Sequence, residues 1–238
     1  MRTLIIIPAY NEQENIVHTV QDVRSHCPEM ELLVVNDCSK DQTRKILVRE
    51  RVNHLDLCSN LGIGGAVQAG YRYALRNDYD IAVQFDGDGQ HDAAYLHALI
   101  QPLLDGRAEI AIGSRFIQKE GFQSSGARRA GILILNRLIR LLCGVRVLDV
   151  TSGMRAVDRR FIREFAEHYA QDYPEPEAIL YAGLKNAVIQ EVPVRMRERE
   201  NGESSISGAW KSIYYMIKVT LALIMGRITI QRERTGGT

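Results

Sequence analysis

The feature that most constrains the fold is a series of short apolar runs, each followed by a polar loop and then by residues with helical spacing. The first run, Thr3–Ile7, is continuously apolar after its threonine, which is typical of a strand buried on both faces of a sheet. Further strands are expected at Glu31–Asn36, His54–Cys58, Ile81–Phe85 and Glu109–Ile112. Regular alternation of strands and helices predicts an α/β fold with a mostly parallel central sheet flanked by helices.

Helical spacing and capping residues mark the elements between these strands. Helices are expected up to about His26 and Glu50, and over Ala66–Arg76, Ala93–Leu104, Ala127–Cys143 and Glu177–Lys185. Asp92 is the predicted N-cap of the helix that starts at Ala93. Prolines set two boundaries: Pro8 is expected to end the first strand, and the prolines on either side of Glu175 predict a non-helical loop.

An acidic loop, Asp86–Asp92, follows the fourth expected strand. Asp86 and Asp88 are two positions apart in an extended segment, so both carboxylates can face one site at the carboxyl end of the strand. Such oxygen ligands suit Mg²⁺ or Mn²⁺ held jointly by the protein and a diphosphate. An EF-hand is excluded because the twelfth position counted from Asp86 is His97 and not glutamate.

Polar residues also follow the first two strands. They are Pro8, Tyr10 and Glu12 after the first strand, and Asn36 and Asp37 at the end of the second. Together with the acidic loop they predict a nucleotide-binding crevice, in which Tyr10 can stack on a base and Asp37 can accept a hydrogen bond from it. Each residue alone fits a turn or a cap equally well. A Rossmann dinucleotide site is excluded because the glycines at 62–65 follow the third strand instead of the first.

Composition limits the classes of function. The chain is 45% hydrophobic and 25% charged with a net charge of +1, which predicts a folded soluble body and no nucleic-acid partner. From Arg115 to Arg163 there are 11 Lys and Arg but 3 Asp and Glu, an excess that suits an anionic substrate. The four cysteines show no metal or CxxC spacing, and no signal peptide is evident, so a cytosolic protein with reduced thiols is expected.

A set of short motifs resembles one known family. The motifs are Ile7–Glu12, Val35–Ser39, Asn60–Gly62, Asp86–His91, Gly113–Phe116, Asp149–Arg155, Glu191–Pro193 and Arg199–Ser204. In this order they resemble inverting family 2 glycosyltransferases of the GT-A fold, closest to the dolichol-phosphate-mannose-synthase-like and bacterial polyprenyl-phosphate group. The resemblance covers residues 1–205, which are expected to form the catalytic domain. One departure is Cys38, where the family often has glycine.

The resemblance implies a role for each matching residue. Pro8, Tyr10, Glu12 and Asp37 would hold the nucleoside, Asp86, Asp88 and Gln90 the metal, Arg115 and Arg199 the phosphates, and Arg128 or Arg129 a donor or acceptor phosphate. Asp88 and Arg199 are thus catalytic candidates. The chemistry agrees, because a departing nucleoside diphosphate needs a divalent cation and arginines to neutralise its developing charge.

The implied reaction is transfer of a sugar from a UDP- or GDP-type donor, and the acceptor is left open. A polyprenyl phosphate is already an anion and needs no base. A hydroxyl of a lipid-linked or cell-wall glycan requires a carboxylate to take its proton, and Glu177 or Glu175 would then be that base. At the start of a helix, Glu177 is equally explained by the helix dipole.

The segment 206–228 is rich in aromatic and aliphatic residues but is interrupted by Lys218. It predicts an amphipathic helix lying on the membrane surface, which would place the protein in the cytoplasm, peripheral to the inner face of the cell membrane. Packing against the core and contact with a second copy in a homodimer are rival interpretations. Residues 229–238 are expected to form a polar tail.

Two other functions compete with glycosyl transfer. Nucleotidyl transfer would predict a glycine-rich loop with a lysine after the first strand, and none is present. A degenerate module that only binds nucleotide-sugars is disfavoured by the intact Asp86, Asp88, Gln90 and Arg199.

Overall fold

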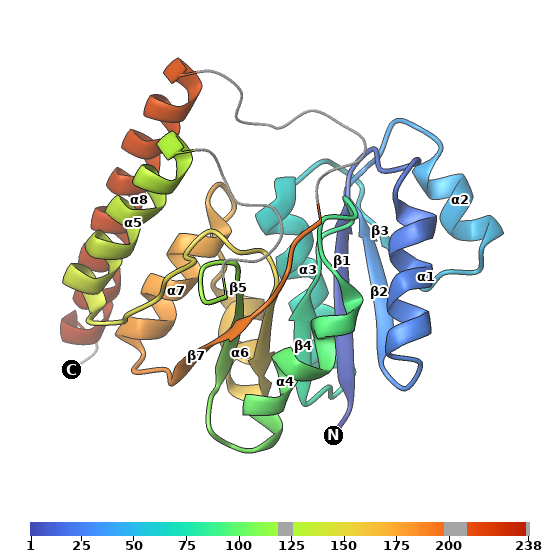
Figure 1. Cartoon of the computed structure of the whole chain (residues 1–238), viewed down its shortest axis with the longest axis horizontal. Coiled ribbons are helices and arrows are strands. Elements are labelled where there is room, and N and C mark those ends of the chain that lie inside the picture. The colour runs from blue at the N-terminus through green and yellow to red at the C-terminus, as the bar shows by residue number, and fades with distance from the viewer. Residues whose placement is uncertain (119–125, 198–208, 237–238) are drawn as a thin grey trace.

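A computed structural model describes residues 1–118, 126–197 and 209–236. Within these residues a seven-stranded sheet has the order β3-β2-β1-β4-β6-β5-β7 (Figure 1). The strands are β1 (Thr3–Ala9), β2 (Glu31–Asn36), β3 (His54–Asp56), β4 (Ile81–Gln84), β5 (Ile110–Ser114), β6 (Arg155–Asp158) and β7 (Ile189–Pro193). All neighbouring strands are parallel except at β6, which runs antiparallel to both β4 and β5. The predicted α/β class with a mostly parallel sheet is confirmed.

Helices cover both faces of the sheet and bury two separate apolar cores. The helices are α1 (Ile16–His26), α2 (Thr43–Arg49), α3 (Gly62–Arg76), α4 (Leu96–Leu104), α5 (Gly126–Cys143), α6 (Arg159–Glu167), α7 (Pro174–Leu184) and α8 (Ala209–Gly236), with a 3₁₀ turn η1 (Ala93–Tyr95) before α4. Helices α1, α2 and α4 contribute to one core, and α3, α5, α6, α7 and α8 to the other. Since β1 is completely buried along its length, its continuous apolar run is explained.

Two boundaries set by proline are wrong. Pro8 lies inside β1, at a point where pairing with β4 has ended at Ile6 but pairing with β2 continues to Ala9, and proline is tolerated where one side of a strand has no partner. Pro174 is the first residue of α7, where its missing N–H costs no helical hydrogen bond, so the expected loop around Glu175 is the first turn of a helix.

Strands β6 and β7 and helix α6 were not predicted. Strand β6 has only four residues and begins and ends with the charged residues Arg155 and Asp158, so it has neither a continuous nor an alternating apolar pattern. The start of helix α6 is marked in the sequence by Asp158, a preferred N-cap residue. In the structure its carboxylate accepts a hydrogen bond of 3.0 Å from the Phe161 N–H. The predicted cap at Asp92 is confirmed, since its side chain accepts from the Ala94 N–H at 3.1 Å.

The C-terminal helix α8 lies alongside α5 at one end of the molecule (Figure 1). It continues to Gly236, through the segment expected as a polar tail. One side of α8 is core, since Val219 and Leu223 are fully buried, while Leu221 on another side is 57% exposed. The rival interpretation of core packing is therefore correct for part of this helix.

Helix α3 packs closely against the segment between α6 and α7, and Gly64 makes this approach possible. A Cβ atom at Gly64 would overlap the backbone of Ala170 and Gln171. We expect Gly64→Ala to lower the free energy of unfolding by about 1–3 kcal/mol, as overpacking does, measured by urea denaturation.

Gly226→Ala in α8 is the matched control. Its Cβ would meet only a Leu180 side-chain atom at 3.6 Å, an ordinary contact. Since alanine favours helix over glycine, this variant should be neutral or more stable by up to about 1 kcal/mol. Equal stability of the two variants would contradict the packing account.

Candidate active site

The carboxyl ends of three neighbouring strands, β2, β1 and β4, open into one cavity of about 410 Å³. Its walls come from the loops after these strands and from the start of α3. The lining residues are Pro8, Ala9, Tyr10, Glu12, Asp37, Asn60, Gly62, Ile63, Ala66, Asp86, Gly87 and Asp88. The structure thus brings together six of the predicted residues: Pro8, Tyr10, Glu12, Asp37, Asp86 and Asp88.

The loops after β1 and β2 are held to one another by hydrogen bonds. The Asn11 N–H donates to Ser39 Oγ at 3.0 Å, and the Lys40 N–H donates to Asn11 Oδ1 at 2.8 Å. Cys38 adopts a left-handed conformation with φ of 57°. Glycine adopts this conformation without strain, which fits the frequent glycine of the family at this position.

Asp37 directly follows β2, is buried and lines the cavity. Its backbone N–H donates to the Ala9 carbonyl at 2.9 Å, and its Oδ1 accepts the Leu61 N–H at 2.7 Å. These bonds fix the side chain between β1 and the start of α3. Tyr10, in contrast, is 42% exposed at the cavity wall, where its ring is accessible to a ligand.

The acidic loop is shaped by contacts that the sequence analysis did not assign. The Asp86 N–H donates to His91 Nδ1 at 3.0 Å, and His91 is buried against the Phe85 ring. The Gln90 N–H donates to Asp88 Oδ1 at 3.1 Å, which closes a tight turn. The buried His91 side chain therefore stabilises the backbone of the loop that carries Asp86 and Asp88.

The Asp86 carboxylate lies next to a buried polar network. Gly153 contacts it so closely that a Cβ there would overlap Asp86 Oδ2. Arg155 is fully buried, and its guanidinium donates to the carbonyls of Ser152 at 2.7 Å and Glu175 at 3.3 Å. Gly153 and Arg155 both belong to the Asp149–Arg155 motif, so the signal was present although their roles were missed.

The network changes the acidity of two carboxyl groups. Burial raises the pKa of Asp86, and the negative charge of Asp88 adds to the rise, while His91 and Arg155 oppose it. Burial also raises the pKa of Glu175, with Arg155 opposing and Asp86 adding to the rise. Glu175 therefore interacts electrostatically with Asp86 of the acidic loop.

Arg115, which the family resemblance assigns to the phosphates, is not among the residues that line the cavity. Its guanidinium is buried and makes a two-pronged ion pair with Asp149, with both N–O distances 2.7 Å, and it also donates to Thr151 Oγ1. Asp149 is held in turn, because its N–H donates to Glu191. These contacts hold Arg115 against the Asp149–Arg155 motif, and its contact with the phosphates stays a prediction.

The other predicted site residues do not line the cavity in the described part of the chain. Gln90 lies on the acidic loop, and its carbonyl accepts the Arg197 N–H at 2.8 Å. Arg129 is exposed in the first turn of α5, and Arg128 belongs to the same turn. Glu177 is half-buried in α7, and its pKa is raised by burial and then by Asp172. Arg199 lies outside the described residues, so its role stays a prediction.

Arg197 joins the segment that leads toward Arg199 to the acidic loop. Its guanidinium pairs with Asp22 at 3.1 Å and with Asp92 at 2.9 Å. The chain two residues before Arg199 is thus anchored to the loop of Asp86 and Asp88. No motif in the sequence indicated this contact.

Four of the eleven basic residues between Arg115 and Arg163 already have partners within the described part of the chain or are buried there. Arg159 pairs with Asp78 and Arg160 with Glu109, while Arg115 and Arg155 are buried. These four arginines are explained by contacts within the protein, so the local charge excess does not by itself assign them to an anionic substrate.

A polar cavity at the carboxyl ends of neighbouring strands, with paired acids on the loop after β4, is where open α/β sheets bind ligands. Residues 4–165 match the model of Glycosyl transferase family 2, and the chain belongs to this family. The predicted enzyme class is confirmed.

Relatives with assigned names include two enzymes of bacterial lipid glycosylation. The polyprenol monophosphomannose synthase of Mycolicibacterium smegmatis is 35% identical over 222 residues, covering 87% of this chain and 82% of that protein. The undecaprenyl-phosphate mannosyltransferase of Micrococcus luteus is 32% identical over 218 residues, covering 87% of this chain and 88% of that protein.

Among solved structures, glucosyl-3-phosphoglycerate synthase from Mycobacterium tuberculosis has the same fold. Its complex with Mn²⁺, UDP-glucose and phosphoglyceric acid matches with a TM-score of 0.72 at 19% identity, covering 95% of this chain and 79% of that chain. At this identity the likeness establishes the fold.

The raised pKa of Asp86 predicts a conflict between function and stability. The folded protein penalises the ionised carboxylate, so Asp86 reduces stability when it is charged at neutral pH and not when it is protonated in acid. Asp86→Asn should therefore raise the Tm at pH 7, by about 2–4 °C for each kcal/mol recovered. The gain should shrink as the pH falls toward about 4, the ordinary range of an aspartate.

Asp41→Asn is the control, for which the opposite change in Tm at pH 7 is expected. Although burial opposes the change, hydrogen bonds from Thr43 and Gln13 lower the pKa of Asp41, so its charged form is stabilised by folding. This variant should have a lower Tm at pH 7. An Asp86→Asn Tm at or below that of the wild type would contradict the account.

Proposed function

We propose that the chain transfers a sugar, with inversion, from a UDP- or GDP-type nucleotide-sugar to a polyprenyl phosphate, using Mg²⁺ or Mn²⁺. The observation that carries the proposal is the single cavity shared by Tyr10, Asp37, Asp86 and Asp88. It offers a nucleoside contact and a pair of acids for a diphosphate-bound cation within one space.

The donor half of the proposal follows from the chemistry of the cavity walls. Tyr10 has an exposed ring for stacking, and the Asp37 carboxylate can accept a base N–H. The Asp86 and Asp88 carboxylates fit a hard divalent cation, which requires oxygen ligands and accepts phosphate oxygens in its remaining positions. When bound, this cation would neutralise charge on the departing diphosphate.

The acceptor half is supported by the named relatives. The proteins from M. smegmatis and M. luteus are named for a polyprenol and an undecaprenyl phosphate. A phosphate oxygen of such a lipid is already anionic and attacks without a base, so the reaction does not depend on a carboxylate at Glu177. Arg199 and the arginines at 128 and 129 remain predicted partners for phosphate groups.

Nucleotide binding tests the metal part of the proposal. Asp88→Asn should reduce sugar transfer by at least about 1,000-fold, the scale on which loss of transition-state charge stabilisation acts. Calorimetry with UDP and GDP, with and without Mn²⁺, should show that the cation strengthens binding to the wild type but not to this variant. Nucleotide binding that is indifferent to Mn²⁺ in the wild type would contradict the proposal.

Transfer to a glycan hydroxyl is the second candidate, and one observation favours it. Glu175 is coupled to Asp86 and has a raised pKa, as a general base near the donor site would. If a hydroxyl is the acceptor, Glu175→Gln or Glu177→Gln should lower kcat by about 100-fold or more. With a polyprenyl phosphate acceptor, Glu177→Gln should stay within about threefold of the wild type, because no proton has to be removed.

Peripheral membrane contact is proposed for the exposed face of α5 and α8. No helix in the described part of the chain is long and apolar enough to cross a membrane. The exposed apolar residues of this face are Leu133, Ile134 and Leu141 on α5, and Tyr214, Ile217, Leu221 and Met225 on α8. Such a face can lie in the headgroup region beside a lipid acceptor, at the cytoplasmic side of the cell membrane.

The membrane contact predicts a loss of liposome binding on charge insertion. Leu221→Glu combined with Met225→Glu should weaken flotation with anionic liposomes by about a hundredfold, since each side chain contributes roughly 1.5 kcal/mol or more when buried. Val48→Glu, at an equally exposed apolar residue on α2, is the control and should bind as the wild type. Unchanged flotation of the double variant would contradict the membrane contact, and a change from dimer to monomer would assign the face to a second copy.

A further inference from the structure

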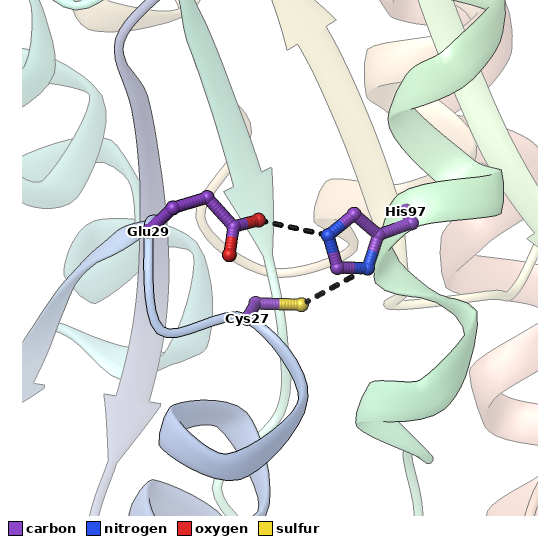
Figure 2. Close-up of side chains that lie close together, drawn as sticks. All are labelled: Cys27, Glu29 and His97. Atoms are coloured by element: carbon purple, nitrogen blue, oxygen red, sulfur yellow. Dashed lines mark hydrogen bonds and ion pairs between the residues drawn. The ribbon is translucent and has the colours of Figure 1, made fainter.

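A second group of potential metal ligands lies away from the cavity. Cys27 follows the last residue of α1, Glu29 lies in the turn before β2, and His97 is the second residue of α4. Figure 2 shows the three side chains converging, with Cys27 Sγ 3.6 Å from His97 Nδ1 and Glu29 Oε1 2.8 Å from His97 Nε2. One ligand atom from each residue lies within 4.8 Å of the others.

We propose that Cys27, Glu29 and His97 form a binding site for one thiophilic divalent cation, with Zn²⁺ as the representative ion. In tetrahedral zinc sites the Zn–S distance is about 2.3 Å and the Zn–N distance about 2.0–2.1 Å, which places sulfur and nitrogen about 3.6 Å apart. Sγ of Cys27 and Nδ1 of His97 already have this separation. A cation can therefore bind between them with little rearrangement of either residue.

Glu29 completes the site from the exposed side. Its carboxylate accepts from Nε2 of His97, which is the usual arrangement for a histidine that binds metal through its other nitrogen. Glu29 therefore orients His97 from outside the coordination sphere, and water fills the ligand positions that Cys27 and His97 leave open. The Glu29 and His97 side chains are each 58% exposed, so the cation and a water ligand can enter from solvent.

The donor set and the location distinguish this site from the proposed catalytic one. A thiolate and an imidazole select Zn²⁺ over Mg²⁺ and Mn²⁺, whereas Asp86 and Asp88 offer only oxygen. Glu29 lies two residues before the amino end of β2, while the cavity lies at the carboxyl end. The cation would join the end of α1 to the start of α4, the helix that follows the acidic loop.

Binding also requires that the Cys27 thiol lose its proton. Burial raises the pKa of Cys27 to about 11, and Glu29 and Asp22 contribute to the rise. Without a cation the thiol is therefore protonated at neutral pH. The cation displaces this proton as the S–metal bond forms, so binding should release about one proton and strengthen as the pH rises.

Titration with Co²⁺, a spectroscopic substitute for Zn²⁺, tests the proposal on the intact chain. A thiolate ligand gives a near-ultraviolet charge-transfer band that oxygen ligands do not give, so the Asp86 and Asp88 site does not contribute to it. The wild type should develop this band at one cation per chain, and Zn²⁺ should abolish it. Cys27→Ser should lack the band, and Cys58→Ser, at an exposed cysteine elsewhere, should keep it.

His97→Gln provides a test that does not alter the buried cysteine. Because His97 is exposed, the variant should fold, and its affinity for Co²⁺ should fall at least about tenfold, as expected for loss of a ligand. Absence of the band in the wild type, its persistence in Cys27→Ser, or an unchanged affinity in His97→Gln would overturn the proposal.

Discussion

The active-site architecture depends on holding two carboxylates close together at the partly buried end of β4. Asp86 and Asp88 repel one another, and burial further disfavours the charged form of Asp86. The protein offsets this cost with the guanidinium of Arg155 beneath the loop and with His91, which fixes the loop backbone. A divalent cation would neutralise the remaining repulsion between the two carboxylates. The unfavourable electrostatics of this loop and the proposed metal requirement therefore have the same physical origin.

The antiparallel strand β6 makes this arrangement possible. It lies between β4 and β5 and carries Arg155 directly beside Gln84 of β4. The Asp149–Arg155 motif, which ends at the first residue of β6, brings Gly153 against Asp86. Asp149 in the same motif forms an ion pair with Arg115 and donates its N–H to Glu191. The Asp149–Arg155 motif therefore supports the acidic loop, and its one arginine, Arg155, is held by carbonyl groups within the protein.

The parts of the fold that the sequence could predict are those with continuous apolar strands. Thr3–Ile7, Glu31–Asn36 and Ile81–Phe85 form neighbouring parallel strands whose carboxyl ends share one edge of the sheet. Tyr10, Asp37 and Asp86, which follow them, therefore line one cavity as expected. Four-residue β6 could not be predicted because burial of its charged residue Arg155 depends on the Glu175 carbonyl, 20 positions away in α7, as well as on the nearby Ser152 carbonyl.

Roles of single arginines were the least predictable part of the site. A motif gives the type of residue at a position but not the residue that it pairs with. For Arg115 the ion-pair partner is Asp149, 34 positions away in the chain. The same limit applies to the cluster of Cys27, Glu29 and His97, since no local spacing connects α1 with α4.

A crystal structure of the chain with Mn²⁺ and UDP or GDP tests the central claim most directly. The account predicts anomalous density for one Mn²⁺ between the Asp86 and Asp88 carboxylates and the diphosphate, with the base against Tyr10 and within hydrogen-bond distance of Asp37. A nucleotide bound outside this cavity, or a diphosphate-bound cation with neither aspartate as a ligand, would contradict it.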